Sequence, residues 1–174
     1  MSLILAIDPG PETSGYVVWD GHAVLEHETD VPNLAVLVFV RAMVASGANF
    51  CACLAIERVA CYGQPVGDPV LETVFWSGRF AEAWAARRTS PVVRMRFNDV
   101  LLHHCHTRRG KESHVRQVLL DRFGAPGTKK APGLLYGVHG HAWSALALAV
   151  AVADQHAEAA LAPALSAPPV NQEA

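Results

Sequence analysis

The chain has 174 residues, of which 51% are hydrophobic and 17% charged, and its formal net charge is −2. This length and composition predict a single domain with a full hydrophobic core. No run of about 18 apolar residues and no basic leader ahead of an apolar segment occurs, so we expect a cytoplasmic protein with no membrane partner. Four cysteines without a Cys-x-x-Cys pair indicate reduced thiols rather than a disulfide framework: Cys51, Cys53, Cys61 and Cys105.

The net charge conceals an asymmetry along the chain. Between Arg87 and Lys130 lie 11 of the 14 basic residues and three of the 16 acids, so this segment carries +8 and the rest of the chain −10. A basic surface attracts polyanions such as nucleic acids. Solvated helix faces would give the same pattern, so charge alone leaves both interpretations open.

The first apolar run, residues 3–8, ends on the carboxylate of Asp8 and turns at once through Pro9 and Gly10. This pattern predicts a buried strand with an acid at its carboxyl end. Residues 16–19 and 22–28 flank the dipeptide Asp20-Gly21, which is typical of a hairpin turn. We therefore expect three antiparallel strands within the first 28 residues.

A second apolar run, residues 51–57, repeats this design and ends on Glu57. A helix is predicted between the two runs, from about residue 33 to residue 46. Two buried strands would then each deliver one acid to the same edge of a sheet. Because adjacent carboxylates repel each other and suit a divalent cation, we expect a metal site at Asp8 and Glu57.

The second half of the chain is mainly helical. Helices are predicted over residues 70–88, from about 98 to 106, over 112–123 and from about 140 to 156, with a strand over 92–97. A basic loop covers residues 107–113, and residues 125–138 predict a mobile basic loop because they are rich in glycine and proline.

This order of elements predicts an α/β fold. Three antiparallel strands followed by two parallel ones would form a five-stranded mixed sheet flanked by helices. We expect residues 1–157 to form the domain and residues 158–174 to be a disordered tail rich in alanine and proline.

The last helix opens with His141-Ala-Trp-Ser144, whose two polar side chains are three residues apart and share one face near the helix start. Its imidazole would be directed at the two acid-bearing strand ends. Four motifs in this order resemble the RuvC family of Holliday-junction resolvases: Ile-Asp8-Pro-Gly with Ser14-Gly15, Ala-Ile-Glu57, Lys111 at the head of a helix, and the motif at His141. The stretch at residues 127–133 is similar to one in the shorter phage-type members, and the resemblance covers about residues 3–156.

The resemblance implies a ribonuclease H-like fold and a homodimer of bacterial or phage origin that cuts four-way or branched DNA in recombination and repair. It also implies two Mg²⁺ or Mn²⁺ ions per active site, with Asp8, Glu57 and His141 as metal ligands and Lys111 and Ser144 as further catalytic residues. Ser144 stands where most members have a second Asp, and a hydroxyl is a poor substitute for a carboxylate ligand. An imidazole in place of an acid should favour Mn²⁺.

The same resemblance assigns contacts with DNA. Phosphate contacts are expected from Arg108, Arg109, Lys111, Lys129 and Lys130. Tyr62 lies in the region where resolvases present an aromatic wedge, so we expect it to stack on a base at the crossover, with packing as the alternative.

Several alternatives remain open at this point. His139 or Asp99 would be the replacements for the missing acid at Ser144. The run His-His-Cys-His at residues 103–106 contains zinc-binding residue types, although consecutive helix residues point in different directions. A binding protein of the same fold would recognise branched DNA without cutting it. The Asp-x-Gly turn also occurs in actin-like kinases, which need a second domain that this length does not accommodate, so no nucleotide cofactor is expected.

Overall fold

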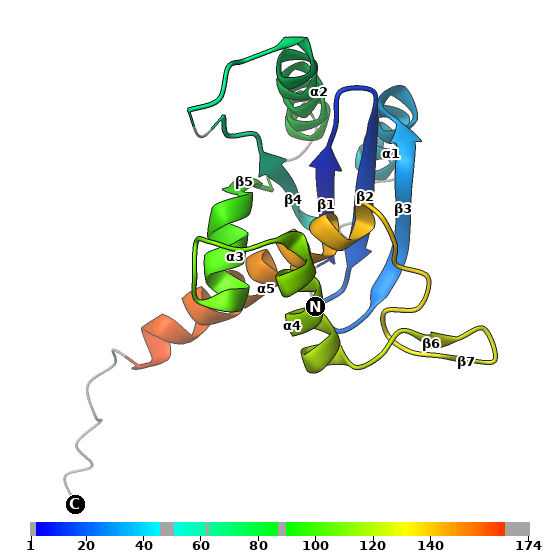
Figure 1. Ribbon diagram of the computed structural model, residues 1–174, viewed down its shortest axis with the longest axis vertical. Helices are drawn as coiled ribbons and strands as arrows, with labels where there is room; N and C mark the ends of the chain where they lie inside the picture. The colour runs from blue at the N-terminus through cyan, green and yellow to red at the C-terminus, as the bar shows by residue number, and fades with distance from the viewer. Residues whose placement is uncertain (1–2, 46–50, 62, 87–89, 166–174) are drawn as a thin grey trace, which may run out of the picture.

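The computed structural model describes residues 3–45, 51–61, 63–86 and 90–165, and it contains the predicted mixed sheet (Figure 1). The strands follow the order β3-β2-β1-β4-β5 across the sheet. The first three pair antiparallel, whereas β4 runs parallel to β1 and β5 parallel to β4. Their bounds are β1 (Leu3–Pro9), β2 (Thr13–Trp19), β3 (Val24–Pro32), β4 (Cys51–Arg58) and β5 (Val92–Arg96).

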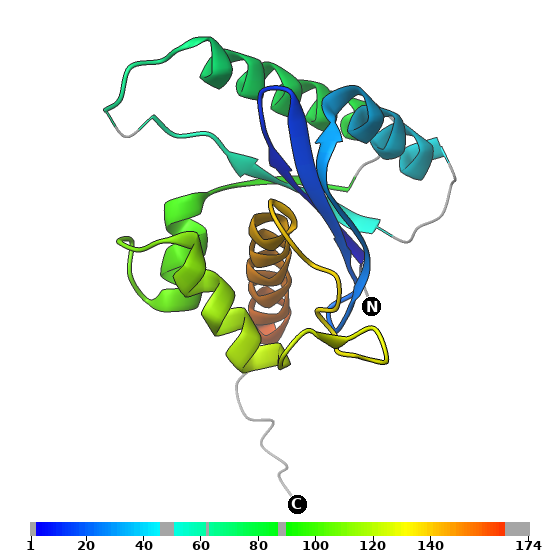
Figure 2. The ribbon, with the colours of Figure 1, turned by 45° about the vertical axis from the view of Figure 1, so that its right-hand side comes forward.

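Helices cover both faces of the sheet and give the molecule three layers (Figure 2). One face carries α1 (Asn33–Ala45) and α2 (Asp68–Ala85). The other carries α3 (Phe97–Cys105), α4 (Glu112–Phe123) and α5 (Ala142–Leu165), of which α5 lies directly against β1, β2 and β4. The sequence order of these elements is therefore as predicted.

The central strand β1 is apolar along most of its length because both of its faces are buried. Leu5 and Ile7 pack with Phe80 and Trp84 on the side of α1 and α2. Ile4 and Ala6 pack on the opposite side, where the small residues of α5 are buried with them: Ala142, Ala145 and Ala149. The two cores hold the end of β1 in a fixed position, which is where Asp8 lies.

Helices α1 and α2 expose several apolar side chains. Leu34 and Val38 of α1 and Val74 and Phe75 of α2 are between 48% and 60% exposed. The buried residues of α1 are Val36, Leu37, Val40 and Val44, with Asn33 at its start. Both helices carry apolar residues around most of their circumference, so the periodicity does not select the side that packs on the sheet.

Two segments of the structure also differ from the expectations. Helix α5 continues past the predicted domain end at residue 157 and runs to Leu165, while residues 166–174 lie outside the described part. The segment expected to be an irregular loop contains a short antiparallel hairpin, β6 (Gly127–Thr128) and β7 (Ala131–Pro132). None of the helices in the described chain combines the length and hydrophobicity that crossing a membrane requires.

Candidate active site

Asp8 and Glu57 leave neighbouring parallel strands at the same edge of the sheet. Ile7 pairs with Ile56 in the parallel register, so the next residue on each strand is an acid. Side chains alternate between the two faces, so both carboxylates are on the side of the sheet that carries α5. The predicted convergence of the two strand ends is therefore present.

His141, immediately before α5, is joined to the end of β1. Its Nδ1–H donates a hydrogen bond to Oδ2 of Asp8 across 3.0 Å. Its main-chain N–H donates to Oγ1 of Thr29 on β3, across 2.9 Å. Two bonds from one residue thus fix the imidazole against the acid and the backbone against the sheet.

The approach of His141 depends on a glycine in β2. Gly15 pairs with Asp8 in the antiparallel register, and a Cβ built on Gly15 would lie 2.7 Å from the Cβ of His141. Gly140 has φ +51, and a Cβ there would lie 2.5 Å from Oγ1 of Thr29. Side chains at either position would separate the start of α5 from the sheet, so both glycines serve the close backbone approach.

A bulge in β3 adds a further acid to the site. Ser14 pairs with Val31 and Tyr16 with Glu28, so Gly15 faces both Thr29 and Asp30. Asp30 has φ +54, an uncommon backbone conformation for a residue other than glycine, and its Oδ1 lies 3.9 Å from Nε2 of His141. The bulge therefore directs two side chains at His141, as bulges beside active sites often do.

The turn after Asp8 is held by two buried polar side chains. The hydroxyl of Ser14 donates to Oδ1 of Asn33 and accepts a hydrogen bond from the N–H of Gly10. The amide of Asn33 donates to the carbonyl oxygen of Gly10 across 3.0 Å. The first turn of α1 thus anchors the loop that follows the acid.

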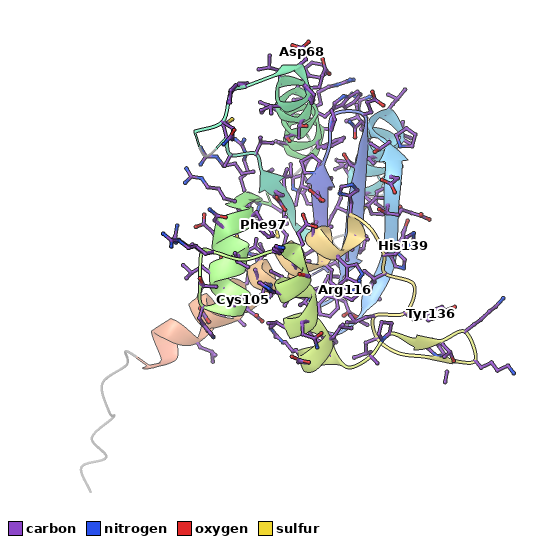
Figure 3. The ribbon with its side chains drawn as sticks, in the orientation of Figure 1. Asp68, Phe97, Cys105, Arg116, Tyr136 and His139 are labelled. Carbon is purple, nitrogen blue, oxygen red and sulfur yellow. The ribbon has the colours of Figure 1, made fainter. Side chains whose placement is uncertain are left out.

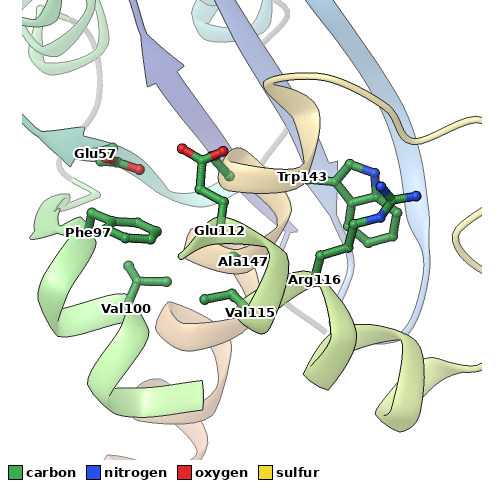
Figure 4. A pocket seen from close by; sticks show the side chains of 9 residues that line it. Glu57, Phe97, Val100, Glu112, Val115, Arg116, Trp143 and Ala147 are labelled. Atoms are coloured by element: carbon green, nitrogen blue, oxygen red, sulfur yellow. The ribbon is translucent and has the colours of Figure 1, made fainter. Parts of the chain in front are cut away.

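Glu57 opens onto a cavity between α3, α4 and α5 (Figure 4). Glu112, the first residue of α4, points into this cavity from the opposite side, and Arg116 lies over the ring of Trp143 at 4.8 Å from its centroid. The remaining lining is mostly apolar: Phe97, Val100, Val115 and Ala147, together with Ser144. The cavity therefore places the carboxyl of Glu57 among apolar side chains, while Glu112 lines the same cavity from an exposed position.

These surroundings change the protonation of the site. Burial first, then the charges of Asp8 and Glu112, raise the pKa of Glu57 to about 8, against a smaller lowering by His141. The hydrogen bond to Asp8 outweighs desolvation and raises the pKa of His141 to about 9. Glu57 resists ionisation beside Asp8, and His141 stays protonated in its hydrogen bond to Asp8. Both effects indicate that negative charge accumulates at this site.

A divalent cation fits this set of donors, because it would offset the repulsion between Asp8 and Glu57. Among the residues that the structure describes, no three His, Cys, Asp or Glu side chains form a ready-made group for a metal ion. Mg²⁺ in proteins is commonly held by one or two carboxylates with water and substrate phosphate, rather than by a complete protein cage. Asp8 and Glu57 match that pattern, and His141 would first have to release its proton and its bond to Asp8.

The other residues expected at the site have varied positions. Ser144 lines the cavity beside Glu57 and makes no side-chain hydrogen bond within the described ranges. Lys111 is exposed directly before α4, and its main-chain N–H donates to Nδ1 of His114 across 3.3 Å. Tyr62 lies outside the described residues.

The expected phosphate-binding residues are exposed. Arg108 pairs with Asp99 across 3.1 Å, whereas Arg109 makes no ion pair in the described chain. Lys129 and Lys130 form the turn between β6 and β7, which projects from the body of the molecule (Figure 3).

The residues considered as replacements for an acid at position 144 have other hydrogen-bond or ion-pair partners. Nδ1 of His139 donates to the carbonyl of Gly137 across 2.7 Å, and Asp99 is held by its pair with Arg108. In the run proposed for zinc, His103 bonds to Asp154 and His104 to the carbonyl of Ala147, so the two rings have separate partners. Sequence reasoning missed Thr29, Asp30 and Glu112; the one available signal was that Glu112 follows Lys111 at a helix start.

The strand order, the parallel β4 and β5 and the helices on both faces define an α/β domain with a ribonuclease H-like fold. Solved structures of RuvC share it. The RuvC structure from Thermus thermophilus matches with a TM-score of 0.63 and 20% identity over 90% of this chain and 96% of that one. T. thermophilus RuvC in complex with a Holliday junction substrate matches with a TM-score of 0.64 and 19% identity over 91% and 97% of the two chains. No protein-family model and no curated protein matches the sequence. The chain therefore has a RuvC-like fold, as the motifs predicted.

Proposed function

We propose that this protein is a metal-dependent endonuclease that resolves Holliday junctions by paired hydrolysis of phosphodiester bonds in DNA recombination and repair. One observation carries the proposal: Asp8 and Glu57 lie at adjoining ends of parallel strands, with His141 bonded to Asp8. The similarity in fold to a RuvC solved with a Holliday junction supports the choice of substrate. The proposal includes a cytoplasmic location, where bacterial or phage DNA is found.

Each residue of the site would have a separate role in such a reaction. Two Mg²⁺ or Mn²⁺ ions, when bound, would supply an activated water and offset charge on the leaving oxygen. Asp8 and Glu57 would hold these ions from rigid strand ends, and His141 would add a nitrogen ligand. Lys111, next to Glu112 at the start of α4, would bring a positive charge to the phosphate.

Contacts outside the reacting phosphate would position the DNA. Arg108, Arg109, Lys129 and Lys130 are exposed and are assigned to phosphates of the junction arms, because phosphate contacts provide most of the affinity for DNA. Tyr62 is assigned to stacking on an unpaired base, which would contribute about 1–3 kcal/mol.

Paired cutting of two strands requires two sites, so the proposal includes a homodimer. The exposed apolar residues of α2 support this part of it, since Leu71, Val74 and Phe75 are all about half exposed. Contiguous apolar residues on a surface often mark a protein interface. We assign the dimer contact to this face of α2.

The direct test is cleavage of a labelled synthetic four-way junction with Mg²⁺ or Mn²⁺. We expect paired nicks from the wild type and none when the metal is chelated. Cleavage in the presence of excess chelator, or no cleavage with either metal, would overturn the assignment.

A second candidate is a protein that binds branched DNA without cutting it. Two observations favour it: Ser144 offers a hydroxyl where an acid would be expected, and the described side chains include no three-ligand metal group. This candidate predicts tight binding of the four-way junction over duplex, with no nick at any metal concentration. The same cleavage assay, paired with a binding measurement, separates the two.

A further inference from the structure

Two arginines lie side by side at the end of the sheet, one residue beyond Glu57. Arg58 ends β4, Arg96 ends β5, and the parallel register pairs them directly. Neighbouring strands are about 4.8 Å apart, so two guanidinium groups leave the sheet at adjacent positions. Like charges in such a pair destabilise a sheet. Folding alone therefore gives no reason for this arrangement.

A third arginine belongs to the same surface. Arg94 is two residues before Arg96 on β5 and pairs with Ile56, so it shares the face of Arg58 and Arg96. We call Arg58, Arg94 and Arg96 the arginine surface. It lies on the side of the sheet that carries α2, whereas Glu57 faces the cavity beside α5.

The arginine surface is exposed, and no acid among the described residues pairs with it. Within the described chain none of its three members makes an ion pair, although Arg108 and Arg122 each have one. The acids of α2, which packs on the same side, do not pair with them either: Asp68, Glu72 and Glu82. The positive charge is thus available to an external anion.

We propose that the arginine surface binds the phosphate backbone of the DNA strand that continues past the scissile phosphate. Glu57 and Arg58 are consecutive residues at the carboxyl end of β4, and Arg96 ends the neighbouring strand β5 just before Phe97 (Figure 3). Guanidinium groups bind phosphate oxygens in a bidentate manner and are preferred for this role. The proposal rests on the proposed function, and it adds a second contact region on the opposite face of the sheet.

The test is a salt titration of binding to a fluorescent four-way junction, in EDTA so that no strand is cut. Arg58→Gln, Arg94→Gln and Arg96→Gln are compared with Arg41→Gln, which removes the same charge from α1. Each surface variant should weaken binding by roughly 3-fold to 10-fold and lower the slope of log K against log salt by about 0.9, the value for one phosphate contact. Arg41→Gln should leave both unchanged.

Thermal unfolding distinguishes binding from a structural role. Because the pair repels, Arg58→Gln and Arg96→Gln should keep or slightly raise the melting temperature; a marked loss of stability would overturn the proposal. Suppose that the wild type binds and cuts junctions. If the three surface variants then have the same junction affinity and salt slope as Arg41→Gln, this inference alone is overturned. A wild type that neither binds nor cuts junctions would overturn the proposed function and this inference together.

Discussion

The Nδ1–H of His141 donates to Oδ2 of Asp8 across 3.0 Å, which joins two residues separated by 133 positions in the chain. This bond connects the start of the longest helix to the end of the central strand. Asp8 is largely buried while the imidazole is 60% exposed, so a ligand from solvent reaches His141 first. The site is therefore mostly closed to solvent on the side of the acid and accessible on the side of the imidazole.

Gly15→Ala should destabilise the protein and reduce cleavage. A methyl group at this position meets the Cβ of His141 at 2.7 Å, so α5 has to move away from β2. Overpacking of this kind costs roughly 1–3 kcal/mol in the free energy of unfolding. Urea denaturation measures this cost. The matched control is Gly78→Ala in α2, where nothing lies within 4 Å and where alanine should stabilise by about 0.5–1 kcal/mol. If the two substitutions change the free energy of unfolding equally, the close approach of His141 to Gly15 is contradicted.

The stability of the metal-free protein should fall as the pH rises from about 5 to 9. The pKa of Glu57 is about 8 in the fold against an ordinary 4.5, so between these values only the folded state holds the proton. His141 has a pKa of about 9 against 6.5, so its stabilising contribution is complete below pH 6.5 and is lost as the pH passes 9. Both groups act in the same direction.

Melting temperatures measured in EDTA across this range test that dependence. Glu57→Gln should reduce the slope because the amide does not titrate, while Glu72→Gln on the exposed face of α2 should retain the slope of the wild type. A Glu57→Gln protein whose melting temperature falls with pH as steeply as the wild type would show that Glu57 is not the titrating group.

Mn²⁺ should bind more tightly as the pH rises from 6 to 9. Both Glu57 and His141 have to lose a proton before they act as ligands. Glu112→Gln removes a charge that raises the pKa of Glu57, so the affinity profile should shift to lower pH. Calorimetric titration with Mn²⁺ measures this, with Glu158→Gln on α5 as the control. An affinity that is independent of pH would contradict the proposed ligands.

Phe75→Glu should dissociate the proposed dimer without unfolding the monomer. The side chain is 54% exposed on α2, so a carboxylate there is tolerated in the isolated chain and excluded from an apolar interface. Light scattering coupled to size-exclusion chromatography measures the mass. Leu161→Glu on α5, at 61% exposure, is the control that should not change it. A monomeric wild type would remove the assignment of α2 as the interface.

The sequence predicted the parts of the site that depend on chain order. Asp8 and Glu57 each end an apolar run, and parallel strands bring their ends to one edge of a sheet, so their proximity followed from the topology. His141 was placed by a motif at the start of a helix. All three of these positions are set by the strands and by the helix that packs on them.

Sequence reasoning did not find Asp30 and Glu112, because their positions depend on packing between distant elements. Asp30 reaches His141 only because β3 bulges opposite Gly15, and no feature of residues 28–31 alone indicates the bulge. Glu112 faces Glu57 because α4 packs against α5 across the cavity. Residue spacing does not distinguish the exposed side of α2 from its buried side either, because apolar residues occur around most of the helix.

Cleavage of a four-way junction by Asp8→Asn, compared with Asp121→Asn on the exposed face of α4, tests the central claim most directly. The amide keeps the size of the side chain and removes the charge that would hold a cation. We predict that Asp8→Asn loses cleavage with Mn²⁺ while it still folds and binds the junction, and that Asp121→Asn cuts like the wild type. Cleavage by Asp8→Asn at the rate of the wild type would contradict the account.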